Sequence, residues 1–264
     1  NPFRIVRKAR AYFHDLQKVN KRKLAGDGRE VARTNLNSSL PDYYLQNFHY
    51  QSDGYLSEAS AELYDYQVEV VFNGGAEAMR RQALVPLGKA FGNRNIRDLR
   101  LLDLACGTGQ FMKSLKQNYP RLAVSGVDLS EPYLFRAKRR LRHWSRFQLI
   151  HGNGENLPFS DESFDAVSCI YLFHELPRPV RRHVAREIHR VLKPNGSLIF
   201  VDSLQPGDHP PFDPLLSHFH QATHEPYYAD FLEDNLKSLF NSTGFKLYSL
   251  ERAFLSRIMT LTKQ

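Results

Sequence analysis

The sequence has few cysteines and no long hydrophobic run, and both absences exclude classes of protein. Its two cysteines, Cys106 and Cys169, are too few for a disulfide framework and show no metal-ligand spacing, so we expect both to pack in a core. No apolar stretch approaches the roughly 18 residues that a membrane-spanning helix needs. We therefore expect a cytoplasmic protein in which 264 residues, 42% of them hydrophobic, bury one large core.

Acidic residues are scarce near the start of the chain. Through Arg33, ten lysines and arginines oppose three acidic residues, an excess of seven that supplies most of the net charge of +8. Apolar residues recur there at helical spacing, at Ile5, Ala9, Tyr12, Phe13, Leu16 and Val19. Such a basic helix can contact an anionic membrane peripherally, but we favour one that packs its apolar stripe on its own domain. The basic clusters at 136–146 and 178–193 lack the interleaved aromatic residues that stack on bases, which argues against a nucleic-acid partner.

A glycine-containing turn at residues 101–110, which read LLDLACGTGQ, is the most informative stretch. It predicts a buried strand that ends in a carboxylate and turns through two glycines into a helix. A dinucleotide fingerprint would need a third glycine where Met112 stands. Asp103 would also oppose a pyrophosphate, whereas it suits a ligand that carries an ammonium group.

Four further strand-and-turn segments follow in order. The strand at 122–128 ends in Asp128, nineteen residues beyond Gly109, close to the spacing at which an acidic residue binds a ribose in doubly wound folds. Strands are predicted next at 147–150 and 164–170. A helix end, an Asn-Gly turn at 195–196 and a fifth strand then run to Asp202.

The ordered set resembles class I S-adenosylmethionine (SAM)-dependent methyltransferases, in the subgroup that includes small-molecule and ubiquinone/menaquinone-type C-methyltransferases. The resemblance covers residues 95–203 strongly and the last thirty residues weakly. It implies an α/β fold, a three-layer Rossmann-like sheet of seven strands with the last strand antiparallel. We predict a basic helix and helical cap over residues 1–94, a SAM-binding domain over 95–264, and a lid insertion at about 204–228.

Outside the motifs, the pattern predicts several further elements. A helix is expected from about Ser57, another at 76–91, and a third at 229–242. Five prolines and Gly207 interrupt residues 204–228, which therefore read as irregular. Two final strands are expected at 245–251 and 254–262.

The resemblance implies S-adenosyl-L-methionine as cofactor and S-adenosyl-L-homocysteine (SAH) as product, and it assigns cofactor contacts by position. Asp103 would bind the methionine ammonium. Gly107 and Gly109 would let the backbone pass beneath the methionine and the ribose. Asp128 would accept hydrogen bonds from both ribose hydroxyls, because a carboxylate offers two oxygens.

The adenine end of the site departs from the family's usual pattern. Leu129 would pack on the adenine. Asn153 stands where relatives usually have an Asp that accepts from the adenine amino group, and an amide oxygen can still accept there. Tyr64, followed by Asp65, resembles a Tyr-Asp pair that closes over the cofactor in related enzymes, and core packing is the alternative for Tyr64. The remaining positions assigned to the cofactor are Ala105, Gly154 and Tyr171.

The acceptor side offers several candidate bases: His174, Glu175, His49, His218, His220 and His224. We take His174, His49 and His224 as the catalytic candidates, although a role in shaping the pocket is favoured for His174. The stretches 47–51 and 224–228 read as two halves of a substrate lid. A zinc site made by His218, His220 and His224 matches no standard spacing, and we expect no metal.

The predicted lid segments, 43–55 and 204–228, are rich in aromatic residues and contain no lysine or arginine. Polyanionic acceptors would need cations there, whereas aromatic rings with a few polar tips suit an apolar acceptor. We therefore expect a small-molecule acceptor that is largely apolar and ring-containing or lipid-like. A protein or nucleic-acid acceptor, or a non-catalytic protein of this fold that binds a partner, stays as an alternative.

Overall fold

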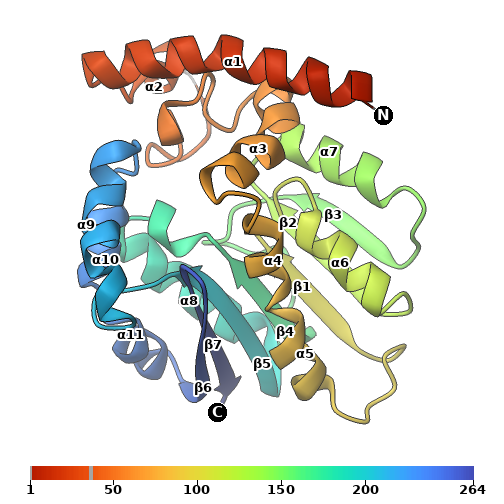
Figure 1. Ribbon diagram of the computed structural model, residues 1–264. Helices are drawn as coiled ribbons and strands as arrows, with labels where there is room; N and C mark the ends of the chain where they lie inside the picture. The colour runs from red at the N-terminus through yellow and green to blue at the C-terminus, as the bar shows by residue number, and fades with distance from the viewer. Residues whose placement is uncertain (1, 36–37) are drawn as a thin grey trace.

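The computed structural model describes residues 2–35 and 38–264, apart from the side chains of residues 2–9, 11 and 220–222. Seven strands form one sheet between layers of helices (Figure 1). They are β1 (Arg100–Leu104), β2 (Ala123–Asp128), β3 (Phe147–His151), β4 (Phe164–Ile170), β5 (Leu192–Ser203), β6 (Phe245–Ala253) and β7 (Ser256–Lys263). Their order is β3-β2-β1-β4-β5-β7-β6, and β7 runs antiparallel to its neighbours, which confirms the predicted fold class.

The helices and short 3-10 turns complete the chain. The N-terminal part contains α1 (Pro2–Ala25), α2 (Glu30–Thr34), η1 (Phe48–Tyr50), α3 (Glu58–Val71), α4 (Ala76–Arg81) and α5 (Leu84–Phe91). Within the sheet region lie α6 (Gln110–Asn118), α7 (Glu131–Leu141), η2 (Phe173–Glu175) and α8 (Arg178–Val191). The last are η3 (Pro210–Phe212), α9 (Asp213–Ala222), α10 (Tyr228–Glu233) and α11 (Leu236–Ser242). No helix of the described residues is long and apolar enough to cross a membrane.

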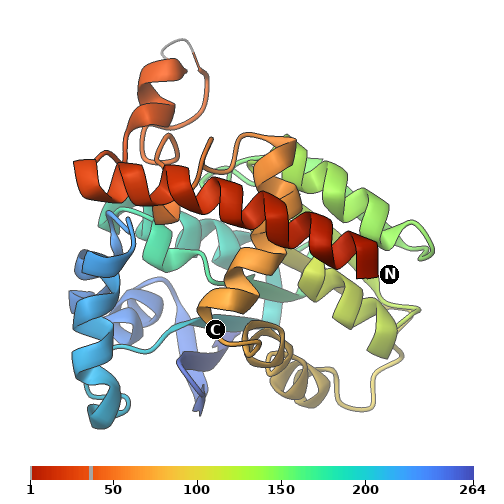
Figure 2. The same cartoon turned by 45° about the horizontal axis from the view of Figure 1, so that its top comes forward.

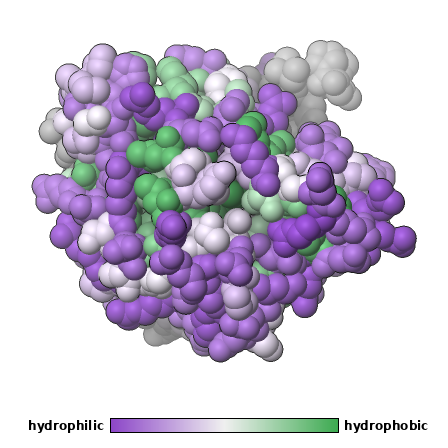
Figure 3. Space-filling view, turned by 90° about the horizontal axis from the view of Figure 1, so that it is seen from below, coloured by the Kyte–Doolittle hydropathy of each residue, from purple (hydrophilic) through white to green (hydrophobic). Residues whose placement is uncertain are grey.

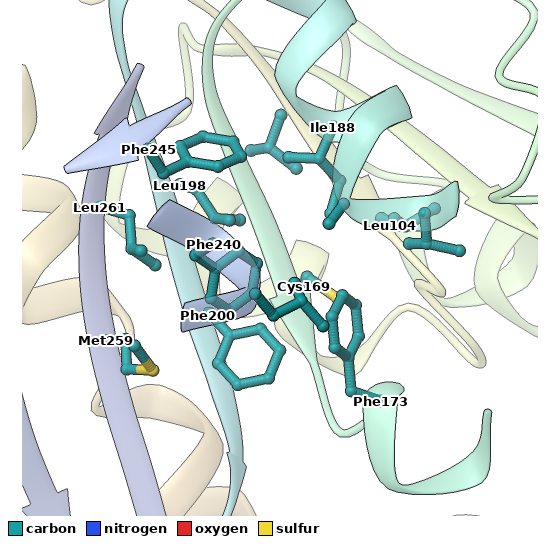
Figure 4. Packing of buried hydrophobic residues seen from close by; sticks show 14 of the residues in the cluster. Leu104, Cys169, Phe173, Ile188, Leu198, Phe200, Phe240, Phe245, Met259 and Leu261 are labelled. Carbon is teal, nitrogen blue, oxygen red and sulfur yellow. The ribbon is translucent and has the colours of Figure 1, made fainter. Parts of the chain in front are cut away.

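Hydrophobic side chains cover both faces of the sheet. Residues of α8, α10 and α11 pack on one face, where the rings of Phe173, Phe200 and Phe240 contact one another and Ile188 belongs to the same cluster (Figure 4). Residues of α5, α6 and α7 pack on the other face. Every residue of β4 is buried, as expected for a central strand of a parallel sheet covered on both sides.

The sheet order reverses between β1 and β4, and this reversal positions the site. β1 pairs in parallel with β2 on one side and with β4 on the other. The chain leaves β1 toward α6 and leaves β4 toward η2, so the two connections diverge. Ligands bind at such a switch point, outside the carboxyl ends of the strands.

A helical cap lies over these carboxyl ends. α1 crosses above α3 along one edge of the molecule (Figures 1 and 2). Tyr12 of α1 packs edge-on against Tyr66 of α3, and Gln67 of α3 donates a hydrogen bond to Asp15. Tyr12, Leu16 and Val19 of the predicted apolar stripe line a cavity against α3, as favoured from the sequence, whereas Phe13 is 62% exposed. The side chains of Ile5 and Ala9 lie outside the described residues.

Three predictions about elements were wrong in detail. The helix expected at 76–91 is divided into α4 and α5, because Pro86 has no N–H for the carbonyl of Gln82, which instead accepts from Val85. The helix expected at 229–242 breaks at Asp234, whose carboxylate accepts from buried Arg181. Residues 204–228 are not irregular throughout, because they contain the ten-residue helix α9.

Candidate active site at the carboxyl ends of the strands

Adjoining cavities lie between the strand ends and the cap. The loop cavity, about 110 Å³, is lined by the turns after β1, β2 and β3, and a smaller one of about 50 Å³ adjoins it at Asp103. The apolar cavity, about 310 Å³, lies among α3, α9 and the β6–β7 turn. Tyr64 and Tyr171 line all three cavities, and Glu175 lines both the loop cavity and the apolar cavity.

The turn after β1 has a backbone that only certain residues tolerate. Ala105, Gly107 and Gly109 all have positive φ, of 54°, 52° and 75°. A Cβ on Gly107 would meet no heavy atom closer than 4.0 Å, and Gly107 lines the loop cavity together with Ala105. Gly109 was predicted to let the backbone pass close to the cofactor, and this stays a prediction, because the residue is not among those that line the loop cavity or the cavity at Asp103. A Cβ on Gly109 would lie 2.9 Å from that of Ala137, so this glycine also allows α6 to pack on α7.

Asp103, at the end of β1, is a buried carboxylate with one oxygen left over. Its Oδ1 accepts a hydrogen bond from Ser168 at 2.7 Å. Its Oδ2 is buried and has no hydrogen-bond partner among the described residues. Burial raises the pKa of Asp103 to about 7, because desolvation disfavours the charged carboxylate and outweighs the opposing effects of the Ser168 hydrogen bond and the charge of Arg80. A cationic donor entering the adjoining cavity would satisfy this oxygen.

Asp128, at the end of β2, is held by the backbone around it. Its Oδ2 accepts from the N–H of Gly107 at 2.7 Å, and its Oδ1 accepts from the N–H of Ser130 at 2.8 Å. Burial nevertheless raises its pKa. Each oxygen keeps one free lone pair, so the residue can still accept from two hydroxyl groups in the loop cavity, which it lines.

The turn after β3 forms the far end of the loop cavity. Leu129, Asn153 and Gly154 all line it. The side-chain oxygen of Asn153 already accepts from the N–H of Glu155 at 2.9 Å. Glu155 also accepts from the hydroxyl of Tyr43 at 2.8 Å, so the cap closes this end of the cavity.

A polar clamp ties α3 to the glycine turn. Asp65 accepts a hydrogen bond from the hydroxyl of Thr108 at 2.6 Å and forms an ion pair with Arg140 of α7. Arg140 also donates to the hydroxyl of Thr108 at 2.7 Å. The clamp holds Tyr64, the residue before Asp65, over the place where the cavities meet.

His174 is a fixed cation beside the apolar cavity. Its Nδ1 lies 2.6 Å from Oδ1 of Asp202, and Oδ2 of Asp202 accepts from the N–H of Phe173. The buried Asp202 carboxylate overcomes the opposing effect of burial and raises the pKa of His174 to about 10. Protonated imidazole cannot accept a proton, so His174 is a poor candidate for a base.

His49 and Glu175 come together at the inner end of the same cavity. His49 Nε2 lies 2.9 Å from Glu225 Oε1, and His49 adopts a left-handed backbone with φ of 53°, a costly conformation for this residue. Glu175 accepts a hydrogen bond from Tyr55 at 2.5 Å. Burial raises the pKa of Glu175 to about 7, while nearby His174 opposes that rise.

The structure does not bring the other predicted histidines to the cavities. The ring of His224 faces Gln46, at 3.2 Å, and Gly28, and it lines neither the loop cavity nor the apolar cavity. His218 is exposed on α9, and the side chain of His220 lies outside the described residues. The two predicted lid halves do meet, because the N–H of His49 donates to the carbonyl of His224 at 3.0 Å.

Several site residues escaped sequence reasoning. Arg80 lines the Asp103 cavity and the apolar cavity, yet it lies in a helix with no local motif. Asp202 was placed at the end of the fifth predicted strand, but no functional role was predicted for it. Arg140 and Glu225 were also missed, because they act through partners distant in sequence.

The loop cavity suits a cofactor with the charges of SAM. Buried Asp103 has an unpartnered oxygen at one end, where an ammonium group would bind. Arg80 stands at the same end and suits a carboxylate. Asp128 offers two acceptor positions midway, and the hydrophobic Leu129 lies beside it on the wall. The residues therefore fit the ammonium, carboxylate, ribose and adenine parts of SAM.

Comparison with known proteins agrees with this geometry. The family model of a methyltransferase domain matches residues 101–196. The demethylmenaquinone methyltransferase of Thermotoga maritima is 40% identical over 107 residues, which are 40% of this chain and 44% of that protein. That of Listeria monocytogenes serovar 1/2a is 36% identical over 109 residues, 40% of this chain and 45% of that protein. The chain thus matches less than half the length of these relatives.

Solved structures share the fold at low identity. A SAM-dependent methyltransferase from Aquifex aeolicus has a TM-score of 0.52 and 18% identity, over 70% of this chain and 93% of that one. The pyocyanin biosynthetic protein PhzM has a TM-score of 0.59 and 14% identity, over 76% of this chain and 58% of that one. Residues 101–196 therefore match a methyltransferase domain, and the strand order and the glycine turn are those that the resemblance to class I SAM-dependent methyltransferases predicts.

Proposed function

We propose that this chain transfers the methyl group of SAM to a small, largely apolar, ring-containing or lipid-like acceptor. The observation that carries the proposal is the pair of adjoining cavities. One has the polar groups that fit SAM, and the other is apolar and meets the first at Tyr64, Tyr171 and Glu175. A methyl transfer needs its two reactants held end to end in this way.

The apolar cavity supports the choice of acceptor. Its walls include aliphatic and aromatic side chains at Val68, Val71, Phe72, Met79, Leu216 and Phe219. Leu215 and Phe254, which also line it, are about half exposed, so the apolar wall continues to the surface. Seen from below, hydrophobic side chains gather in a hollow of an otherwise hydrophilic face (Figure 3). Arg80 is the one Lys or Arg among the residues that line this cavity, which argues against a polyanionic acceptor.

The chain's own residues have distinct tasks in such a reaction. Asp103 and Arg80 would hold the amino-acid end of SAM, and Asp128 the ribose. Bound SAM supplies a methyl group on a positively charged sulfur, whose departure leaves a neutral thioether. Tyr64, Tyr55 and Tyr44 surround the loop cavity and exclude water from it. Proximity and orientation of this kind supply about 7–11 kcal/mol of a barrier.

The names of the relatives favour a ring acceptor. Those that match at 33–40% identity are called demethylmenaquinone methyltransferases, which is consistent with a quinol-like ring in the apolar cavity. A protein or nucleic-acid acceptor is the second candidate, and a non-catalytic partner-binding role is the third. Retention of both strand-end carboxylates disfavours the third, because a protein that no longer binds SAM does not need them.

The test combines cofactor binding with an acceptor panel. Isothermal titration should show SAM and SAH binding, and Asp128→Ala should weaken both by at least tenfold, since each lost charge-assisted hydrogen bond contributes roughly 1.5–3 kcal/mol. Glu233→Gln, an exposed change on α10, is the matched control. Formation of SAH is then measured with menadiol, hydroquinone, 4-nitrocatechol, a histone peptide and transfer RNA. Affinity in Asp128→Ala within threefold of wild type, or turnover of RNA or peptide alone, would contradict the proposal.

A further inference from the structure

Five ionisable side chains crowd the place where the loop cavity and the apolar cavity meet. Glu175 lines both cavities, and His49 and His174 line the apolar one. Asp202 and Glu225 stand behind the two histidines, each with its side chain fully buried. A methyl group that passes from one cavity to the other must pass this junction, so these groups surround the reacting centre.

Each histidine forms a close pair with one carboxylate, and Glu175 belongs to neither pair. His174 is paired with Asp202 at 2.6 Å, and His49 with Glu225 at 2.9 Å. Glu175 is contacted by the Tyr55 hydroxyl at 2.5 Å and lies 4.0 Å from Nε2 of His174. A hydroxyl donor and an imidazolium both stabilise its ionised form, while burial opposes it.

We propose that Glu175 is the general base of the reaction and that the acceptor therefore carries an ionisable hydroxyl group on its ring. This inference rests on the proposed function and specifies its acceptor. The acceptor O–H bond breaks with its electron pair left on oxygen, and the proton joins a Glu175 oxygen. The electron pair left on oxygen then forms the bond to the methyl carbon, either directly from oxygen or through a carbon of the ring. At the same time the carbon–sulfur bond breaks, and its electron pair goes to sulfur. Where a ring carbon attacks, that carbon afterwards releases its proton to water.

The neighbours of Glu175 suit this role. The pKa of Glu175, raised by burial to about 7, lies near the operating pH, where a base is most effective. The fixed positive charge of His174 stabilises the oxyanion that forms, so we assign His174 as a positioning residue. His49 with Glu225, and Tyr55 and Tyr64 from the cap, complete the groups that face Glu175.

The same cluster raises the alternative of a metal site. Among the described residues, ligand atoms of His49, Glu175 and Glu225 lie within 4.8 Å of one another. His174, whose pKa is raised to about 10, stands 4.0 Å from Glu175. A protonated His174 would oppose the binding of a divalent cation there, so we favour a proton-transfer cluster over a metal.

The first test needs no acceptor. The positively charged sulfur of SAM favours the ionised form of Glu175, whereas the neutral sulfur of SAH does not. SAM and SAH carry the same charges everywhere else. Titration in buffers of different ionisation enthalpy should therefore show roughly half a proton more released with SAM than with SAH at pH 7. Glu175→Gln should abolish that difference while SAH affinity stays within threefold, and Glu233→Gln should keep it. Tyr55→Phe, which removes a stabilising hydrogen bond, should move the difference to higher pH.

The second test uses acceptor acidity. If Glu175 removes the proton, Glu175→Gln should lower kcat/KM at least 100-fold for weakly acidic hydroquinone. It should lower kcat/KM less than tenfold for 4-nitrocatechol, which is largely ionised in solution at pH 8. Equal losses on both, an unchanged proton release in Glu175→Gln, or turnover abolished by EDTA and restored by Mn²⁺ would each overturn the proposal. SAM binding that Asp128→Ala does not weaken would instead count against the proposed function.

Discussion

At the residue scale, the buried carboxylate of Asp103 lowers the stability of the folded protein, but it also provides the group that would bind the ammonium of SAM. Its folded pKa of about 7 exceeds its ordinary value of 3.8, so the folded state keeps a proton that the unfolded chain releases. Stability therefore falls as pH rises from about 4 to about 7, and the cost is fully present above 7. Asp103→Asn removes this cost. Without ligand, Asp103→Asn should have a larger free energy of unfolding than wild type. This difference should be roughly 1–3 kcal/mol larger at pH 8 than at pH 5.

The same substitution should weaken SAM binding, because the neutral amide has no charge for the ammonium group. Thermal unfolding at both pH values and titration with SAM measure the two effects separately. Ser168→Ala serves as a comparison, since it removes the hydrogen bond to Asp103 and keeps the carboxylate. An advantage of Asp103→Asn that is equal at pH 5 and pH 8 would contradict the burial argument.

How far a residue could be assigned from sequence depended on where its partners lie. Asp103, Gly107 and Asp128 follow strands directly, so the strand-and-turn pattern was sufficient to place them at one sheet edge. Glu225 and Arg80 reach the site through the packing of α9, α10 and α4 against the strand ends. No local pattern encodes that packing.

At the element scale, α3 is held on the glycine turn by the clamp of Asp65, Thr108 and Arg140. Asp65→Asn should release it, because the remaining amide cannot form the ion pair with Arg140. We expect faster amide hydrogen exchange in α3 and SAM affinity at least fivefold weaker. Glu58→Gln, an exposed change in the first turn of the same helix, should alter neither. Unchanged exchange in Asp65→Asn would show that hydrophobic packing alone positions the cap.

Element boundaries show the same limit of sequence reasoning. The start of α3 was predicted correctly, because Ser57 caps it by accepting from the N–H of Ser60. The break between α10 and α11 was missed, because it depends on the contact of Asp234 with Arg181, which lies fifty-three residues away. Local capping signals can be read along the chain, whereas breaks caused by tertiary contacts cannot.

At the scale of the whole molecule, the outer face of α1 is both basic and apolar. Phe13 and Leu24 are 62% and 90% exposed, and eleven positions apart they lie within about 20° of each other around the helix. Exposed Arg10, Lys21 and Lys23 flank them. Each cation near an anionic surface contributes about 1 kcal/mol. We propose that this face binds an anionic membrane peripherally, close to a lipid-like acceptor.

Co-sedimentation with vesicles tests this face. The protein should bind phosphatidylglycerol vesicles and not phosphatidylcholine vesicles, and high salt should release it because exposed charges are screened. Replacing both Phe13 and Leu24 with Glu should weaken binding at least tenfold. Tyr248→Glu is the matched control, since it adds a negative charge at a residue that is 77% exposed on β6, and it should change binding less than twofold. Equal binding to both kinds of vesicle, or equal weakening by the control, would mean that α1 does not carry the contact and that its exposed apolar residues are only solvated surface.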